Sequence, residues 1–186
     1  MTPILRQIPN ILTALRIVLA PLTAWLILNG RFADSLLVFG TAGASDALDG
    51  FLARRFGLVS RFGEYLDPAA DKLLMLASFL TLTMIGMAPL WVTAIVIGRD
   101  LAIVAGVALA RLLALPIKVE PLAVGKASTV VQVGYVGLLL LLLSLGLDMP
   151  SLTMTAAITC VGFTLASWLA YGQLLFKAFA LGRRPA

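Results

Sequence analysis

An all-α membrane protein with six transmembrane helices and a short N-terminal interfacial segment is the fold that this sequence predicts. Of its 186 residues, 61% are hydrophobic and only 12% are charged. A soluble domain is typically about 25% charged, so this composition excludes a soluble enzyme, a disordered protein and a disulfide scaffold. At about 25–30 residues per helix and connection, the length holds six spans. Because we find no linker and no internal repeat, we expect one domain over residues 1–186.

Six apolar segments can be drawn after the lead-in of residues 1–9. They are Asn10–Asn29, Ser35–Ala53, Pro68–Met87, Leu90–Leu115, Leu122–Leu147 and Ser151–Phe176. The first segment follows Arg6 and continues to Gly30 without a small-residue cleavage site. We therefore interpret it as a retained span and not as a signal peptide.

The next three segments contain features that a hydropathy profile alone would miss. The second carries Asp46 and Asp49, and the fourth carries Arg99 and Asp100, so both have a lowered hydropathy. The third begins at Pro68, which suits the first turn of a helix because its missing N–H group has no intrahelical partner there.

The fifth and sixth segments are the clearest spans, and the loops around all six predict their orientation. No charged residue lies between Lys126 and Asp148 or between Asp148 and Lys177, so each segment can cross a hydrocarbon core of about 30 Å. One set of loops and termini carries Arg6, Arg54, Arg55, Arg61, Lys118, Lys177, Arg183 and Arg184, and the opposite set carries only Arg31. Because basic loops stay cytoplasmic, we expect both termini on the cytoplasmic side of the membrane.

The residue types that are missing exclude several kinds of chemistry. The sequence has no histidine, which excludes a serine–histidine triad, histidine zinc sites and haem bound through histidine. Cys160 is the only cysteine, so no intrachain disulfide is expected. The formal net charge of +5 fits membrane orientation better than nucleic-acid binding, because the sequence has no basic run and no aromatic platform.

Four aspartates gather near the cytoplasmic ends of the second and third segments. Asp46 and Asp49 are three residues apart, and Asp67 and Asp71 are four apart, so each pair shares one helix face. Carboxylates that lie together at a membrane boundary repel one another, and a divalent cation removes that conflict. Oxygen ligands alone suit magnesium, manganese or calcium, and magnesium usually also binds substrate phosphates. The cluster therefore predicts a phosphate-bearing substrate.

The connection between the two pairs also suits a phosphate-bearing ligand. Arg54 and Arg61 lie close to the acids in sequence, and guanidinium groups match phosphate oxygens in geometry. Gly50 and Gly63 permit close approach of a ligand to the backbone.

Together these residues resemble the signature of the CDP-alcohol phosphatidyltransferases. The match reads Asp46-x-x-Asp49-Gly50-x-x-Ala53-Arg54, eight further residues, and Gly63-x-x-x-Asp67-x-x-x-Asp71. All eight signature residues are present at the family spacing. The stretch Pro9-Asn10-x-x-Thr13-x-x-Arg16 also looks like the opening of the bacterial phosphatidylglycerophosphate synthase and cardiolipin synthase branches.

The resemblance implies an architecture, a reaction and a set of residue roles. Family members are six-helix homodimers with a cytoplasm-facing polar cavity, and they transfer a phosphatidyl group from a CDP-linked donor to an alcohol with release of CMP. By this resemblance, one or two Mg²⁺ or Mn²⁺ ions are bound by Asp46, Asp49, Asp67 and Asp71, and Asp71 is the general base on the acceptor hydroxyl. The implied nucleotide-binding residues are Asp49, Gly50, Ala53, Arg54, Gly63, Asn10 and Thr13. The implied partners are CDP-diacylglycerol, a glycerol-containing acceptor, membrane lipids and a second copy of the chain.

Charged residues of the fourth and fifth segments leave two interpretations open. Arg99 and Asp100 form either an internal ion pair or part of a second polar pocket. That pocket would bind an acceptor phosphate through Arg61, Arg111 and Lys126.

The same region bears on the identity of the acceptor. Thr129 and Gln132 follow Lys126 at one-turn spacings, and they either extend its face or form hydrogen bonds between helices. The stretch Arg99-Asp100 together with these positions looks more like the cardiolipin synthase branch, whose acceptor is phosphatidylglycerol. Glycerol 3-phosphate is the alternative acceptor, and its branch often has Glu where Asp100 stands.

Two functions of other classes compete with this interpretation. Intramembrane acids also occur in small cation- or proton-coupled transporters, and a membrane scaffold needs no catalytic group. Both rank lower, because a transporter predicts dispersed acids and repeat symmetry, whereas a scaffold needs no ordered set of four carboxylates.

Overall fold

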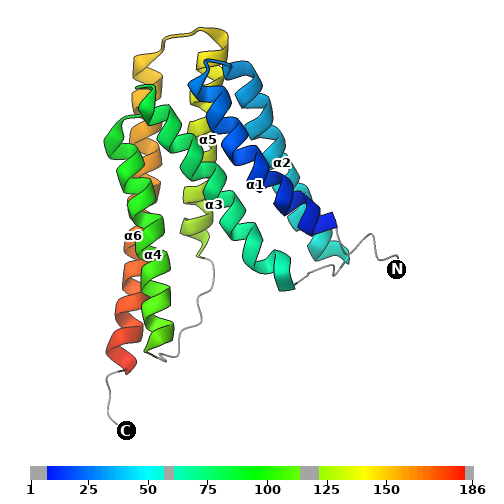
Figure 1. Cartoon of the computed structure of the whole chain (residues 1–186). Helices are drawn as coiled ribbons and strands as arrows, with labels where there is room; N and C mark the ends of the chain where they lie inside the picture. The colour runs from blue at the N-terminus through cyan, green and yellow to red at the C-terminus, as the bar shows by residue number, and fades with distance from the viewer. Residues whose placement is uncertain (1–7, 57–60, 114–121, 183–186) are drawn as a thin grey trace. The chain divides into compact units, whose positions relative to one another are not determined.

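The computed structural model describes the backbone of residues 8–56, 61–113 and 122–182, and the side chains of residues 15–45, 72–110, 112–113 and 122–176. Six helices follow one another along the described chain (Figure 1). They are α1 (Ile8–Leu28), α2 (Phe32–Phe56), α3 (Arg61–Met84), α4 (Leu90–Leu112), α5 (Ala123–Leu145) and α6 (Pro150–Gly182). Each overlaps one predicted segment, which confirms the prediction of an all-α membrane protein.

Two helix ends differ from the sequence-based expectation by more than about one turn. α3 begins at Arg61, so Pro68 lies inside the helix and the prediction that it occupies the first turn is wrong. α6 continues from the predicted end at Phe176 to Gly182. In both cases the apolar segment is shorter than the helix, because hydropathy marks where the membrane ends and not where the backbone hydrogen bonds of the helix end.

Three of the helices meet the length and hydropathy expected of membrane spans within the part of the chain whose side chains are described. They are Leu90–Ala110, Ala123–Leu145 and Pro150–Phe176, of 21, 23 and 27 residues. Large apolar side chains are exposed along the helices, including Leu37, Leu112, Leu169 and Phe176, which are 68–84% exposed. Extended apolar surface of this kind is typical of contact with lipid.

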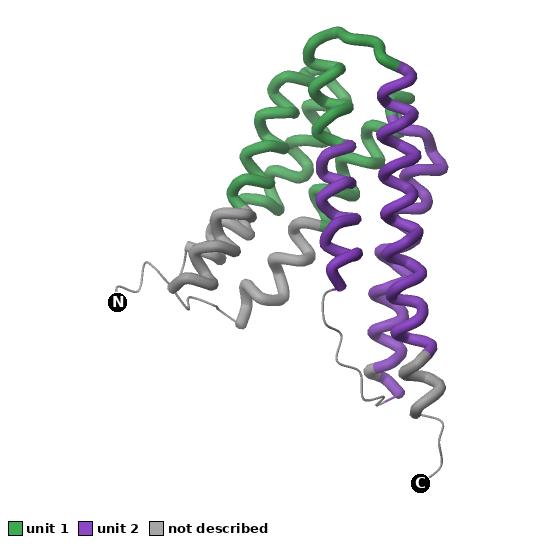
Figure 2. Tube along the Cα trace, turned by 180° about the vertical axis from the view of Figure 1, so that it is seen from behind, with its two compact units in different colours: residues 1–87, 136–149 green, residues 88–135, 150–186 purple. Residues whose placement is uncertain are grey.

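The chain divides into two compact units (Figure 2). Unit 1 comprises residues 1–87 and 136–149, and unit 2 comprises residues 88–135 and 150–186. In unit 1, α1 packs against both α2 and α3. Its buried apolar side chains include Ala20, Ile27, Phe39, Phe79 and Leu82, each at most 5% exposed.

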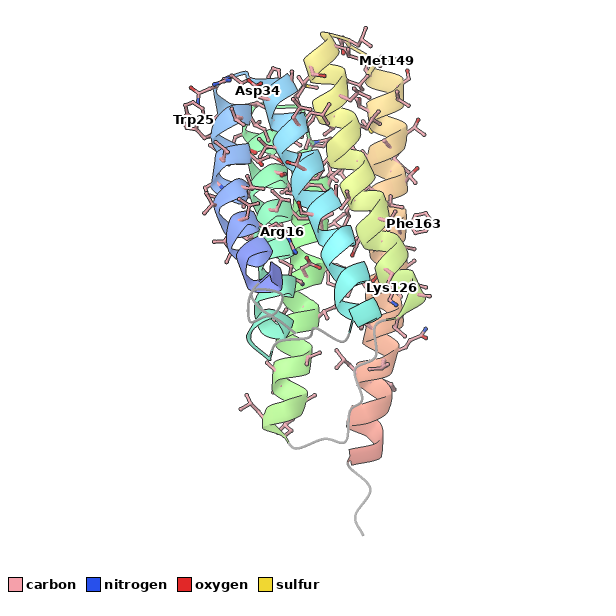
Figure 3. All side chains as sticks on the ribbon, turned by 90° about the vertical axis from the view of Figure 1, so that its right-hand side faces the viewer. Arg16, Trp25, Asp34, Lys126, Met149 and Phe163 are labelled. Carbon is pink, nitrogen blue, oxygen red and sulfur yellow. The ribbon has the colours of Figure 1, made fainter. Side chains whose placement is uncertain are left out.

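A glycine ends α1 and reverses the chain into α2. Gly30 has a φ of 70°, a conformation that costs glycine little because it has no Cβ. Its amide donates to the Ile27 carbonyl at 3.1 Å, and the Arg31 amide donates to the Leu26 carbonyl at 2.9 Å. This paired arrangement satisfies the last carbonyls of the helix. Asp34, labelled in Figure 3, follows this turn in the first turn of α2.

In unit 2, α4 packs against α6, and the two helices approach closely at Gly106. A Cβ atom added to Gly106 would lie 2.5 Å from Leu175 Cδ1 on α6. The Leu175 side chain therefore occupies the space over Gly106, and a side chain at position 106 would have to displace it.

Gly106→Val is expected to destabilise the protein by about 1–3 kcal/mol, because it overpacks this contact. A Leu175→Ala change in the same chain should restore most of the loss by making room. The melting temperature in detergent measures both effects, and Gly162→Val, at a position with open space around its Cβ, is the matched control. A Gly106→Val variant that melts like the control would contradict the close approach of α4 and α6.

Candidate functional site

The first aspartate pair shares its helical register with buried residues of α2. Ser35, Phe39 and Ala42 are at most 5% exposed in unit 1. Asp46 and Asp49 follow Ala42 by four and seven residues within the same helix. Helical periodicity places all five positions on one face. The two aspartates of this half of the signature therefore occupy the same helical register as the buried residues of α2.

The second aspartate pair, Asp67 and Asp71, shares its helical register with buried residues of α3. Leu74 and Ser78 are buried, at 5% and 0% exposure. Asp71 precedes Leu74 by three residues and Ser78 by seven. Asp67 lies seven residues before Leu74, and Gly63 lies one turn before Asp67. Residues at these spacings share one helix face. Both halves of the signature are thus in register with the buried faces of helices that pack on α1.

The helical register of the buried Ala20 on α1 also contains polar residues of its N-terminal half. Thr13 precedes the buried Ala20 by seven residues and Arg16 by three, and Asn10 lies one turn before Thr13. The Arg16 side chain, labelled in Figure 3, is 1% exposed and has interaction partners within the protein. A charge that is buried in a membrane helix is costly unless it is paired. Sequence analysis gave Arg16 no role, and its complete burial is visible only in the structure.

Most of the predicted site residues have side chains outside the described part of the chain. They are Asn10, Thr13, Asp46, Asp49, Gly50, Ala53, Arg54, Arg61, Gly63, Asp67, Asp71 and Arg111. Convergence of the four carboxylates therefore stays a prediction. Among the side chains that are described, no group of three or more aspartate, glutamate, histidine or cysteine residues lies together. The predicted carboxylate set nevertheless fits a hard divalent cation in donor chemistry, because it supplies only oxygen.

Arg99 is held by partners within unit 2. The residue is 7% exposed; its Nη1 donates to Asp100 Oδ1 at 2.6 Å, and its Nη2 donates to Ser167 Oγ on α6 at 2.6 Å. A buried guanidinium needs such partners because its desolvation is costly. Of the two interpretations that the sequence left open, this geometry favours the internal ion pair for Arg99 and Asp100.

Tyr171 joins the Arg99 pair to the beginning of α5. The centre of its ring lies 5.6 Å from Arg99 Cζ, and its hydroxyl accepts a hydrogen bond from the Leu122 amide at 3.3 Å. A Cβ atom at Gly125 would lie 3.0 Å from both the Tyr171 hydroxyl oxygen and its Cε2 atom. Glycine at position 125 therefore makes room for the ring against the α5 backbone.

Lys126 is the predicted acceptor-phosphate residue whose side chain the structure describes. It lies in the first turn of α5 and is exposed (Figure 3). Its amide donates to the Leu122 carbonyl at 3.1 Å, which fixes its backbone to the start of the helix. Thr129, one turn on, donates to the Gly125 carbonyl at 3.2 Å and is also exposed. The ammonium group of Lys126 is thus accessible to an anionic ligand.

Gln132 forms hydrogen bonds between α5 and α6. It is 4% exposed, and its Nε2 donates to Thr164 Oγ1 on α6 at 3.0 Å and to Ser128 Oγ at 3.3 Å. The hydrogen-bonding interpretation is therefore favoured for Gln132. Tyr171 and Ser167 were not singled out by sequence analysis, because polar side chains of this kind are common in membrane helices.

Comparison with known proteins relates the chain to lipid-synthesis enzymes. It is 41% identical over 110 residues to the "Cardiolipin synthase (CMP-forming)" of Streptomyces coelicolor, which covers 56% of this chain and 51% of that protein. It is 35% identical over 147 residues to the "Probable cardiolipin synthase (CMP-forming)" of Drosophila melanogaster, covering 70% and 46%. The chain spans about half the length of these two relatives. It is also 35% identical over 158 residues to the "Probable phosphatidylglycerophosphate synthase" of Mycobacterium tuberculosis, covering 81% and 74%.

The family resemblance found in the sequence is confirmed by a direct match. The sequence model described as CDP-alcohol phosphatidyltransferase covers residues 6–176, including both halves of the aspartate signature. Because this match takes in nearly the whole sequence, the chain belongs to the CDP-alcohol phosphatidyltransferase family.

Proposed function

We propose that the protein transfers a phosphatidyl group from CDP-diacylglycerol to phosphatidylglycerol, forming cardiolipin and releasing CMP. The observation that carries this proposal is the family match over residues 6–176 together with the complete eight-residue signature. Relatives named cardiolipin synthase support phosphatidylglycerol as the acceptor. The same match, which crosses both compact units, supports their action as a single domain over residues 1–186.

The proposed roles follow from the chemistry of each residue type. Asp46, Asp49, Asp67 and Asp71 hold one or two Mg²⁺ or Mn²⁺ ions, which when bound stabilise charge on the diphosphate. Asp71 accepts the proton of the acceptor hydroxyl as that oxygen attacks phosphorus. The CDP moiety is bound by Asp49 with Gly50, Ala53, Arg54, Gly63, Asn10 and Thr13. Arg61, Arg111 and Lys126 bind the acceptor phosphate.

The proposed location of the site is the cytoplasmic face of a bacterial inner membrane. The donor has two acyl chains that belong in lipid and a nucleotide that belongs in water, so a cavity at the interface meets both demands. The signature lies in the last turns of α2 and the first turns of α3, and Arg54, Arg55 and Arg61 lie at the adjoining ends of these two helices. Basic connections favour the cytoplasmic side. We also propose a homodimer, as the family resemblance implies.

Glycerol 3-phosphate is the second candidate acceptor. It is favoured by the similarity to the Mycobacterium tuberculosis relative, a probable phosphatidylglycerophosphate synthase, of which the chain covers 74%. Both acceptors carry a phosphate, so the proposed basic residues suit either one.

An assay that offers both acceptors together decides between them. Purified protein in mixed micelles with CDP-diacylglycerol and Mg²⁺ is expected to release CMP and to form cardiolipin from phosphatidylglycerol, detected by thin-layer chromatography. Formation of phosphatidylglycerophosphate instead would establish the second candidate. Absence of CMP release with either acceptor would contradict both.

A further inference from the structure

We infer that Tyr171 of α6 is a positioning residue for acceptor binding: it holds the first turn of α5, and with it Lys126, in the geometry that receives the acceptor phosphate. This inference rests on the proposed function, because it takes Lys126 as a contact of that phosphate. Tyr171 itself is half-buried between Arg99 and the α5 backbone, so its role is exerted through Lys126 and not through substrate contact.

Tyr171 contacts the first turn of α5 at two points. Its hydroxyl accepts a hydrogen bond from the Leu122 amide at 3.3 Å, and amides at a helix start have no intrahelical acceptor of their own. Its ring lies against Gly125, where a Cβ would come within 3.0 Å. Lys126 is the next residue, and its amide donates to the Leu122 carbonyl at 3.1 Å. Tyr171 therefore fixes the position of Leu122, and the hydrogen bond between Leu122 and Lys126 fixes the backbone of Lys126 one helical turn later.

Arg99 holds the Tyr171 ring in turn. The distance of 5.6 Å from Arg99 Cζ to the ring centre is within the range of about 6 Å for a cation–π contact. Ser167 accepts from Arg99 Nη2 and lies one turn before Tyr171 on α6, so one face of α6 supplies both contacts. Asp100 on α4 and Ser167 on α6 thus fix the Arg99 guanidinium, and the Tyr171 ring beside it contacts α5.

Two substitutions at Tyr171 test the inference by separating its hydroxyl from its ring. Tyr171→Phe, which loses only the hydroxyl, is expected to raise the KM for the acceptor by about 3–5-fold. Tyr171→Leu, which also loses the ring, should raise it by about tenfold or more. In Tyr171→Phe, the kcat and the KM for CDP-diacylglycerol should stay within about twofold of wild type, since only one hydrogen bond, outside their contacts, is removed. Loss of kcat alone, or equal changes in both KM values, would indicate a structural role and overturn the inference.

Tyr135→Phe supplies the matched control. Tyr135 is a buried tyrosine that lies on α5 more than two turns beyond Lys126. Its variant should keep the wild-type KM for the acceptor. If Tyr135→Phe raised the acceptor KM as much as Tyr171→Phe does, the change in KM would not depend on the first turn of α5.

A double-mutant cycle tests the route through Lys126. Lys126→Gln should raise the acceptor KM, and adding Tyr171→Phe should then have little further effect, because both changes act on one contact. If the two effects multiply, Tyr171 does not act through Lys126 and the inference fails.

Hydrogen exchange gives a readout that needs no catalysis. In Tyr171→Phe, amides of residues 122–126 should exchange faster than in wild type, whereas those in the rest of α5 should not. Unchanged exchange at residues 122–126 in a protein that releases CMP normally would refute the inference alone. Absence of CMP release by the wild type would refute the proposed function instead.

Discussion

Replacing Asp71 with Asn is expected to slow phosphatidyl transfer by about 10²–10⁴-fold, the contribution of a positioned general base. Asparagine has nearly the same size and shape as aspartate, but it cannot take a proton from the acceptor hydroxyl. The loss should therefore appear in kcat, measured as CMP release at saturating CDP-diacylglycerol and acceptor. The melting temperature should change little, which would exclude misfolding as the cause.

The concentration of metal separates the two roles proposed for Asp71. A variant that had lost only a metal ligand would recover as Mg²⁺ is raised, whereas one that had lost the base would not. Asp34→Asn is the matched control, because its exposed ion pair with Arg31, at 2.7 Å, is of a kind that contributes only about 0–1 kcal/mol. An Asp71→Asn variant within a few-fold of wild type would refute the assignment.

The helices of this protein could be predicted from sequence because lipid imposes one simple demand. Every backbone polar group must be paired inside the segment, so a long apolar stretch becomes a helix. The ends of α3 and α6 were less predictable, since both helices continue past their apolar stretches to Arg61 and Gly182. Hydropathy carries no signal for a helix that extends into the interface.

The candidate site was predictable to the extent that it is local in sequence. The spacing of Asp46 and Asp49 from the buried Ala42, and of Asp71 from the buried Leu74, follows from helical periodicity alone. The partners of Arg99 were not predictable in this way. Ser167 is 68 residues away along the chain, and only the packing of α4 against α6 brings it within hydrogen-bond distance. The exposure of Lys126 beside the buried Gly125 is likewise a product of tertiary packing.

Removal of divalent metal is expected to abolish CMP release, and addition of Mg²⁺ or Mn²⁺ should restore it. The physical reason is that four carboxylates at a membrane boundary cannot approach an anionic diphosphate without a cation to offset their charge. Dialysis against EDTA followed by metal titration measures this directly. Full activity after exhaustive removal of metal would contradict the proposed carboxylate site.

Substitution of a signature aspartate should raise the Mg²⁺ concentration needed for activity, whereas substitution of another acid of the chain should not. Asp67→Asn is expected to raise the Mg²⁺ concentration for half-maximal activity by at least about tenfold, because loss of even an outer-shell group costs that much in affinity. Asp148→Asn, at an exposed position between α5 and α6, should titrate like wild type. Ca²⁺ should support less activity than Mg²⁺, since it prefers oxygen distances of about 2.3–2.6 Å over the about 2.0–2.1 Å of magnesium and would hold the diphosphate differently. If Asp67→Asn and Asp148→Asn had the same metal requirement, the four aspartates would not form the binding site.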